Sequence, residues 1–335
     1  MVDLFPKPPC IVTFQDAINE GAMLQCVCLA RLVESATNQR PFVLDYRNPH
    51  RKAAYDGHPS KNVLLGFAKQ AMRLSPAFDD EGAAAEWIND NASIAICGSD
   101  EIWKWPFPGC DRRFHCPSPN IYLGLGITIP KVAYSVSIGS SPAESYPEQF
   151  PGLLREFSLV AARDNATLRL VQRFRGAVKL SDPTLGVTLE SVFPGYQEAA
   201  EQIAPKRPFT FLTDPWISEQ FVREFAVGEV VTTLPSPYRN LGPQEPHVWA
   251  GLHGLASLVI SHRFHSTLMA YLHDTPCRIY QERNKVLDFV AEAGLGQQPC
   301  VRPASAGEFL ERCRSEHRKV LEEIFHPIAC SLSNL

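Results

Sequence analysis

Short apolar runs alternate with helical patterns throughout the second half of this chain, and this alternation limits the possible folds more than any other feature. Each apolar run has the length of a buried strand, and each segment between two runs has room for one helix. Strands are expected at 209–213, 229–234, 257–261 and 277–281, and helices at 216–226, 246–256, 265–272 and 285–293. A strand, a helix and a second strand make a βαβ unit with parallel strands. The second half is therefore predicted to be a parallel α/β domain.

The first half repeats the alternation less regularly. Its strands are expected at 9–14, 41–46, 93–97, 131–137, 159–161 and 177–180, and its helices at 22–33, 63–73, 83–89, 150–157 and 166–174. A loop rich in Pro, Gly and Cys fills 104–130, a polar helix at 196–204 links the halves, and an amphipathic helix at 306–325 ends the pattern. We expect an α/β fold of two Rossmann-like domains, residues 1–190 and 191–335, whose parallel sheets face a cleft.

Composition describes an ordinary globular protein. The chain has 335 residues, of which 45% are hydrophobic, and a net charge of −4, which argues against a general nucleic-acid or anionic-membrane surface. No apolar run is long enough for a membrane span, and the N-terminus has no signal-peptide core, so a cytoplasmic location is expected.

The ten cysteines are expected to be reduced, with Cys26, Cys28, Cys97 and Cys277 in the core. The spacings Cys26-x-Cys28 and Cys110-x5-Cys116 are poor for zinc, so no metal site is predicted.

The segment 258–285 holds the strongest local signal for chemistry. Arg263, His265 and Ser266 follow the strand at 257–261, where a helix N-terminus offers free N–H groups to an anion, and Lys285 follows the next strand. Arginine grips a carboxylate or phosphate with a planar fork, and histidine exchanges protons near neutral pH. If the segment is extended, Arg263 and His265 point to the same side, and we favour this version. If the helix starts at Ser261 instead, His262 and His265 share a face and Arg263 diverges. The interpretation without a function is a core histidine beside a surface arginine.

Polar residues also follow the strands of the first half. Asn19 and Gln25 flank Gly21 after the first strand, and Ser99, Asp100 and Trp103 follow the strand at 93–97. Asp100 can accept a proton from a hydroxyl, and Trp103 offers a flat face to a sugar ring. Taken singly, each group has a plainer interpretation as a helix cap or a core residue.

Two further strand-end groups are weak alone. Arg163-Asp164 reads equally well as a surface pair, and Asp182-Pro183-Thr184 as the start of a turn.

Together these motifs resemble those of the polysaccharide pyruvyl transferase family, in order and spacing, over roughly residues 10–295. The matching segments are Asn19-Glu20-Gly21-Ala22-Met23-Leu24-Gln25, Gly98-Ser99-Asp100-Glu101-Ile102-Trp103, Ala133 to Gly139, Ala162-Arg163-Asp164, Ser181-Asp182-Pro183-Thr184, Arg263-Phe264-His265 and Lys285. Glu20, Glu101 and Lys104 depart from the usual aromatic residue, Gln and Asn of the family.

The resemblance implies a pair of Rossmann-like domains of the glycosyltransferase-B type. It also implies transfer of the pyruvyl unit of phosphoenolpyruvate to two hydroxyls of one sugar in polysaccharide or glycan biosynthesis. The products are a cyclic pyruvate ketal and phosphate, and no cofactor is implied. The partners are phosphoenolpyruvate and a sugar or glycan acceptor. A lipid-linked acceptor would hold the enzyme at the membrane periphery.

Residue roles follow from the same resemblance and from what a small anion requires. Arg263 is assigned to the donor anion, His265 to acid–base catalysis, and Asp100 to the acceptor hydroxyl. Further donor contacts are Ser266, Lys285 and Arg163, with a structural ion pair as the alternative for Lys285 and either substrate open to Arg163. The acceptor pocket is assigned to Asn19, Gln25, Ser99 and Trp103. These roles put the donor on the second domain and the acceptor on the first.

Two other functions stay open. A glycosyltransferase of the same fold would use a nucleotide sugar, because two Rossmann-like halves host many chemistries. A non-catalytic glycan-binding protein is the other alternative.

Overall fold

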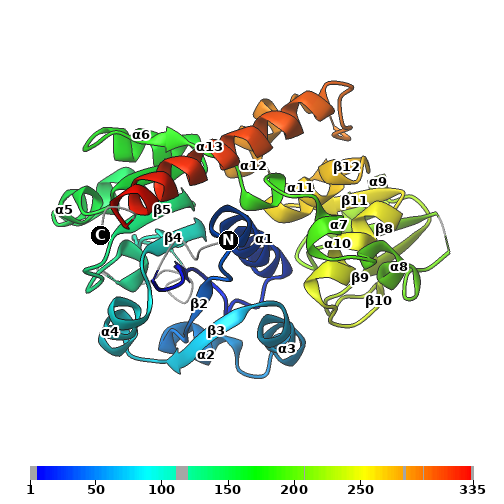
Figure 1. Cartoon of the computed structure of the whole chain (residues 1–335). Coiled ribbons are helices and arrows are strands. Elements are labelled where there is room, and N and C mark those ends of the chain that lie inside the picture. The colour runs from blue at the N-terminus through cyan, green and yellow to red at the C-terminus, as the bar shows by residue number, and fades with distance from the viewer. Residues whose placement is uncertain (1–5, 111–119, 207, 282–283, 297, 333–335) are drawn as a thin grey trace.

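Two parallel β-sheets form the two halves of the molecule (Figure 1). The computed structural model describes residues 6–110, 120–206, 208–281, 284–296 and 298–332. The first sheet has the strand order β3-β2-β1-β4-β5-β6-β7. Its strands are β1 (Cys10–Val12), β2 (Phe42–Tyr46), β3 (Arg73–Phe78), β4 (Ala95–Asp100), β5 (Lys131–Val136), β6 (Leu159–Ala162) and β7 (Val178–Lys179).

The second sheet has the order β10-β9-β8-β11-β12, again with every pairing parallel. Its strands are β8 (Phe209–Leu212), β9 (Glu229–Thr232), β10 (Arg239–Asn240), β11 (Leu258–Ser261) and β12 (Cys277–Ile279). The strand order reverses between β1 and β4 in the first sheet and between β8 and β11 in the second. In open α/β sheets ligands bind outside the carboxyl ends of the strands at such a reversal.

Helices connect the strands. In the first half they are α1 (Glu20–Thr37), α2 (Pro49–Tyr55), α3 (Lys61–Ala71), α4 (Glu81–Asn91), α5 (Phe150–Arg155) and α6 (Asn165–Gln172), with short 3₁₀ turns η2 (Ile121–Leu123), η3 (Ala143–Ser145) and η4 (Pro183–Leu185). From the link onward they are α7 (Leu189–Val192), α8 (Tyr196–Glu201), α9 (Glu219–Phe225), α10 (Pro246–Leu255), α11 (Phe264–Leu272), α12 (Asn284–Glu292) and α13 (Ala306–Leu332). The predicted α/β fold with two parallel sheets is confirmed.

The long helix α13 runs from one half to the other (Figure 1). Near its start, Phe309 and Cys313 belong to the apolar core of the second sheet. Further along, Val320 and Phe325 pack into the core that α1 forms on the first sheet. The helix at 306–325 is therefore amphipathic because its apolar face packs into two different cores, one in each half.

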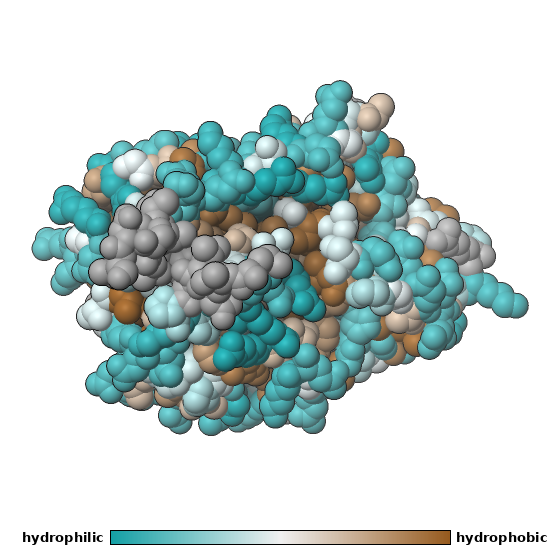
Figure 2. All heavy atoms as spheres, in the orientation of Figure 1, coloured by the Kyte–Doolittle hydropathy of each residue, from teal (hydrophilic) through white to brown (hydrophobic). Residues whose placement is uncertain are grey.

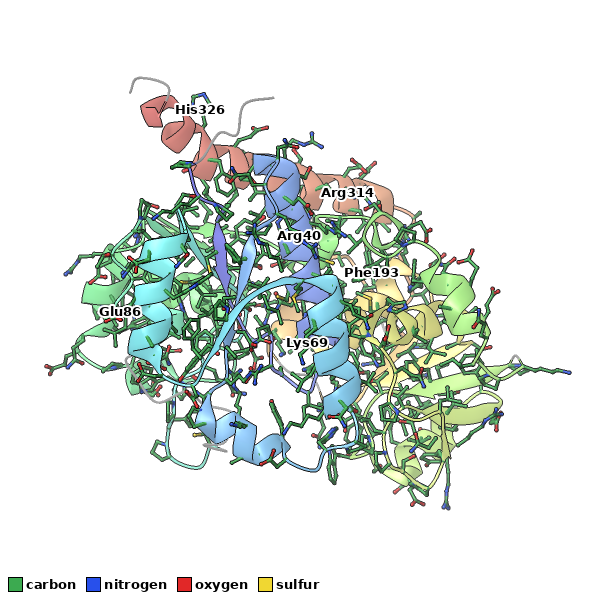
Figure 3. All side chains as sticks on the ribbon, turned by 60° about the horizontal axis from the view of Figure 1, so that its bottom comes forward. Arg40, Lys69, Glu86, Phe193, Arg314 and His326 are labelled. Carbon is green, nitrogen blue, oxygen red and sulfur yellow. The ribbon has the colours of Figure 1, made fainter. Side chains whose placement is uncertain are left out.

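Aromatic rings make a second connection between the halves. Phe193, labelled in Figure 3, forms a cluster with Phe67 of α3 and His247 of α10. The ring centroid of Phe193 lies 5.9 Å from that of Phe67 and 6.0 Å from that of His247, and the latter two are also 6.0 Å apart. Seen from the side of Figure 1, the surface is hollowed between the halves, where brown, hydrophobic residues are visible (Figure 2). The described residues include no helix that is long and apolar enough to cross a membrane.

Four elements, three in the first half and β10 in the second, are among those that differ from the prediction. The helix expected at 63–73 ends at Ala71, and β3 follows it although it contains Pro76. Proline is tolerated there because β3 is the edge strand. Helix α2 and the two-residue strand β10 carry too little periodicity to be predicted.

Other predictions hold in the described part of the chain. Residues 104–110 and 120–130 contain only the 3₁₀ turn η2, as expected of a loop, while 111–119, with Cys116, lie outside the described residues. Cys26, Cys28, Cys97 and Cys277 are free and buried, as predicted.

Candidate active site

The cleft between the halves is built where both strand orders reverse. It has a volume of about 370 Å³. The segments after β1, β2 and β4 face helix α10 and the segments after β8, β11 and β12. The residues that line the cleft are Phe14, Ala17, Asn19, Ala22, Arg51, Tyr55, Asp100, Glu101, Lys104, Asp214, Trp216, Trp249, His262, Arg263, Phe264, His265 and Lys285. The structure thus places Asn19, Asp100, Arg263, His265 and Lys285 in one cleft.

Helix α11 begins at Phe264, so the expectation of an extended 263–265 segment is wrong. Arg263 has extended backbone angles (φ −92°, ψ 139°) and is the N-cap residue, while His265 lies in the first turn. The hydroxyl of Ser261 accepts a hydrogen bond from the N–H of Arg263 at 2.9 Å. The buried α11 packs on β11 and must start directly after the turn, which places its N-terminal N–H groups at the cleft.

The two polar side chains at this turn therefore diverge. Arg263 lies near Asp214 after β8, with its Nε 3.4 Å from Oδ2. His262 shares that carboxylate, with Nδ1 2.8 Å from the same oxygen. Burial raises the pKa of Asp214, but the His262 hydrogen bond and the Arg263 charge outweigh burial and hold it below its usual range.

His265 turns toward the first half and meets Asp182. Its Nε2 lies 3.3 Å from Oδ2 of Asp182, and the hydroxyl and N–H of Thr184 donate to the other carboxylate oxygen at 2.7 and 3.1 Å. Asp182 thus engages the Nε2 side of the ring, while Nδ1 lies against Gly21, where an added Cβ atom would come within 2.5 Å of it. Burial raises the pKa of Asp182, but His265 and Arg163 hold it well below its usual range.

Arg163 lies beneath the cleft and joins two carboxylates. It donates to Asp182 at 3.0 Å and to Asp100 at 3.2 Å, and its guanidinium lies 5.1 Å from the ring centre of Phe264. Burial favours a lower pKa for Arg163, but Asp100 and Asp182 raise it. Arg163 is buried and does not line the cleft, so it fixes the positions of the acidic groups.

Helix α13 supports the same group from behind. His317 is fully buried, with Nε2 3.2 Å from the carbonyl oxygen of Asp182 and Nδ1 2.6 Å from the hydroxyl of Tyr134. The Tyr134 hydroxyl donates to Nδ1, and Nε2–H donates to the carbonyl. Burial lowers the pKa of His317 to about 4, so the ring is neutral at physiological pH.

Carboxylates of the first half pair with the cations of the second half across the cleft. Arg263 lies 3.6 Å from Glu20, and Lys285 is bonded to Glu101, which also lies 3.4 Å from Lys104. Burial raises the pKa of Glu101, but Lys285 and Lys104 lower it far below its usual range. Glu20 and Glu101 are two of the residues that depart from the family motifs.

Gly21 brings the N-termini of α1 and α11 together. A Cβ atom at Gly21 would lie 2.4 Å from the Cβ and Cγ atoms of His265. Asn19 caps α1 through hydrogen bonds to the N–H groups of Gly21 and Ala22, at 3.0 and 3.3 Å. Asn19 is therefore both a helix cap and part of the cleft wall.

Besides Arg163, four predicted binding residues do not line the cleft. Gln25 and Ser99 bond to each other in the core, and the hydroxyl of Ser266 lies 2.7 Å from Nε2 of buried His253. Trp103 is 1% exposed, and its indole N–H donates to the carbonyl of Tyr122 at 2.9 Å. The expectation that Trp103 offers a face to a sugar is wrong, because aromatic residues enclose it.

Trp216 and Asp214 line the cleft although neither is among the predicted site residues. Trp216 is 83% exposed, and its backbone N–H donates to Asp214 at 3.0 Å. Both follow the predicted strand at 209–213, so their position at a strand end was the available signal. The described residues contain no group of three or more His, Cys, Asp or Glu side chains placed to hold a metal ion.

Comparison with solved structures defines the class of fold. The chain matches a putative UDP-N-acetylglucosamine 2-epimerase of Listeria monocytogenes with 10% identity and a TM-score of 0.53, over 95% of this chain and 91% of that one. It matches the S. aureus MnaA–UDP structure with 9% identity and a TM-score of 0.55, over 96% and 91%. The structure is therefore an α/β protein of the glycosyltransferase-B type.

The family follows from the sequence comparison. The family model named polysaccharide pyruvyl transferase matches residues 19–281, and the chain belongs to this family. Membership of this family indicates a transferase. No curated protein matches the chain.

Proposed function

We propose that this protein transfers the pyruvyl group of phosphoenolpyruvate to two hydroxyls of a sugar and forms a cyclic ketal. One observation carries the proposal. Arg263, His265 and the free N–H groups of α11 meet Lys285 in a cleft whose opposite wall holds Asp100. This arrangement combines a place for a small anion, a group that exchanges protons, and a carboxylate that can orient a hydroxyl.

The donor site is assigned to the second half of the cleft. The guanidinium of Arg263 and the ammonium of Lys285 supply positive charge, and the N-terminus of the nine-residue helix α11 adds its dipole. Because Glu20 and Glu101 already pair with these cations, the donor anion must displace them. Each displacement weakens donor binding, and it also leaves a carboxylate available at the side where the acceptor enters.

His265 is assigned to the proton transfers. The methylene carbon of phosphoenolpyruvate gains a proton, and the cationic C2 that results is attacked by the first hydroxyl. The phosphate then leaves as the carbon–oxygen bond breaks, and the second hydroxyl closes the ring. The two protons lost by the sugar hydroxyls equal the one gained by the methylene carbon and the one carried away by the phosphate. Asp182 holds the ring of His265 in the wall of the cleft through the contact to Nε2.

The acceptor is assigned to the space between Asp100 and Trp216. Asp100 adopts a left-handed conformation (φ 86°), and Arg163 holds its carboxylate at the edge of the cleft. The exposed indole of Trp216 provides the flat apolar surface that a sugar ring requires, in place of Trp103. The sugar then contacts both halves of the molecule, rather than the first half alone.

The test is incubation with phosphoenolpyruvate and a panel of glycosides, with phosphate release and ketal formation as readouts. A nucleotide sugar is the competing ligand, because the structurally similar proteins include one solved with UDP. Thermal stabilisation by phosphoenolpyruvate but not by UDP-N-acetylglucosamine supports the transferase. The opposite result refutes the proposed donor.

A further inference from the structure

A second cavity adjoins the active-site cleft and takes no part in the function proposed above. It has a volume of about 210 Å³ and lies between α3, α2, the segment after β1 and the ends of β2 and β3. Most of its wall is apolar and is formed by Ala17, Ile18, Leu64, Leu65, Ala68 and Leu74. We refer to it as the side cavity.

The side cavity and the cleft share two residues. Ala17 and Tyr55 line both spaces. The two spaces therefore meet at Ala17 and Tyr55, which is where an acceptor bound in the cleft would enter the side cavity. The size of the cavity limits what enters: an apolar cavity of about 150 Å³ holds a benzene molecule, so one substituted aromatic ring fits, whereas a long hydrocarbon chain does not.

The acids around the side cavity are already neutralised. Asp45 accepts two hydrogen bonds from the guanidinium of Arg47, at 3.1 and 2.8 Å, and one from Gln15 at 2.8 Å. Asp16 lies 3.3 Å from Arg51. The two carboxylates therefore leave little negative charge to face a ligand.

Lysines give the rim of the cavity a positive charge. Lys61 pairs with Asp56 at 2.5 Å, but Lys52 and Lys69 form no ion pair within the described part of the chain. Lys69 is exposed on α3, as labelled in Figure 3. An apolar interior with a cationic rim is complementary to an apolar group that carries a negative charge.

We propose that the side cavity binds a compact, apolar and anionic aglycone, so that the acceptor is an aryl-type glycoside and not a free sugar or a long lipid-linked sugar. This inference rests on the proposed function, because it extends the acceptor site of the same reaction. It assigns the aglycone to the first half of the molecule and the sugar ring to the cleft.

The first experiment compares acceptors that share one sugar. Methyl, para-nitrophenyl and para-carboxyphenyl glycosides of the same sugars are tested with phosphoenolpyruvate, and kcat/KM is measured from phosphate release. We expect para-nitrophenyl glycosides to exceed methyl glycosides by at least about tenfold, because burying an aromatic ring removes its apolar surface from water. We expect para-carboxyphenyl glycosides to exceed both. Equal values for all three overturn the proposal and leave the transferase function intact.

Two variants locate the effect. Leu65→Trp fills the side cavity and should bring the ratio of aryl to methyl glycosides close to one, while turnover of methyl glycosides stays unchanged. Leu125→Trp is the matched control, because Leu125 is 41% exposed in the same half and lines neither space. Lys69→Glu changes an exposed residue and should remove only the preference for the carboxyphenyl group. An unchanged ratio in Leu65→Trp contradicts the assignment.

Benzoate binding tests the cavity independently of turnover. Wild-type protein should be stabilised against heat by benzoate, both with and without phosphoenolpyruvate, and Leu65→Trp should lose this stabilisation. If the wild type binds benzoate, Leu65→Trp does not, and the wild type transfers no pyruvyl group, the cavity assignment is supported and the proposed function is refuted. Benzoate binding that Leu65→Trp leaves unchanged refutes the cavity.

Discussion

Asp182 is the residue on which the site depends most, and Asp182→Asn tests this directly. Its side chain is fully buried, and its carboxylate contacts Arg163, His265 and Thr184. Asparagine keeps an oxygen for Thr184 but removes the negative charge, so Arg163 retains only Asp100 as a close charge partner among the described residues. Breaking a buried ion pair by removing one partner costs about 3–5 kcal/mol. We expect a loss of about 3 kcal/mol, at the lower end of this range. The asparagine oxygen still accepts from Thr184, and the carboxylate of Asp100 still pairs with Arg163.

The same change should lower the rate of transfer. Without the charge of Asp182, the ring of His265 loses the carboxylate that orients it and stabilises its protonated form. Positioned acid–base groups contribute about 10²–10⁴-fold, so kcat for Asp182→Asn should fall by about that factor. The KM for phosphoenolpyruvate should change less, because Arg263 and Lys285 are untouched.

The assay combines urea unfolding with phosphate release at saturating phosphoenolpyruvate. Asp288→Asn is the matched control: Asp288 accepts hydrogen bonds from Asn165 at 2.9 and 3.0 Å across the two halves but does not line the cleft. The control should lose about 1 kcal/mol and keep its activity. An Asp182→Asn protein with the stability and kcat of the control refutes the reasoning. If Asp182→Asn does not fold, His265→Gln tests the catalytic part alone.

Three further predictions follow from the cleft and the core. Glu101→Gln removes the carboxylate that pairs with Lys285, so the KM for phosphoenolpyruvate should fall several-fold; an increase would show that the pair assists donor binding. Trp216→Ala should raise the KM for the acceptor about tenfold or more and leave the KM for the donor unchanged, and equal effects on both would contradict its role. Burial lowers the pKa of His253 to about 3 and that of His317 to about 4, from 6.5. The unfolded chain therefore binds protons more tightly than the folded protein, and the free energy of unfolding should fall as the pH drops from about 6.5 to 4. Urea midpoints that stay constant over this range would contradict the neutral, buried state of both rings.

The sequence predicts the fold well where spacing alone decides it. Strands such as β8 and β11 are short apolar runs at intervals of one helix, and no other arrangement buries them. Strand β3 shows the limit, because Pro76 reads as a break, and only the position of the strand at the edge of the sheet makes it possible.

The site is predictable in its location but not in its contacts. The rule for strand ends brings Asp100, Arg263 and His265 to one cleft. The pairing of His265 with Asp182 is different, because 83 positions separate the two residues and neither motif points to the other. Periodicity also fails to distinguish Trp103 from Trp216: both follow strands, and only the packing of rings around Trp103 decides which of them is exposed.

The most direct test of the central claim is transfer itself. Wild-type protein and His265→Ala are incubated with phosphoenolpyruvate and the glycoside panel, and phosphate release is measured together with the mass of each glycoside. We expect the wild type to form one pyruvyl ketal for each phosphate released, and a folded His265→Ala protein to be slower by about 10²–10⁴-fold. This expectation is contradicted if no glycoside of the panel gains a ketal, or if His265→Ala forms it at a rate near that of the wild type.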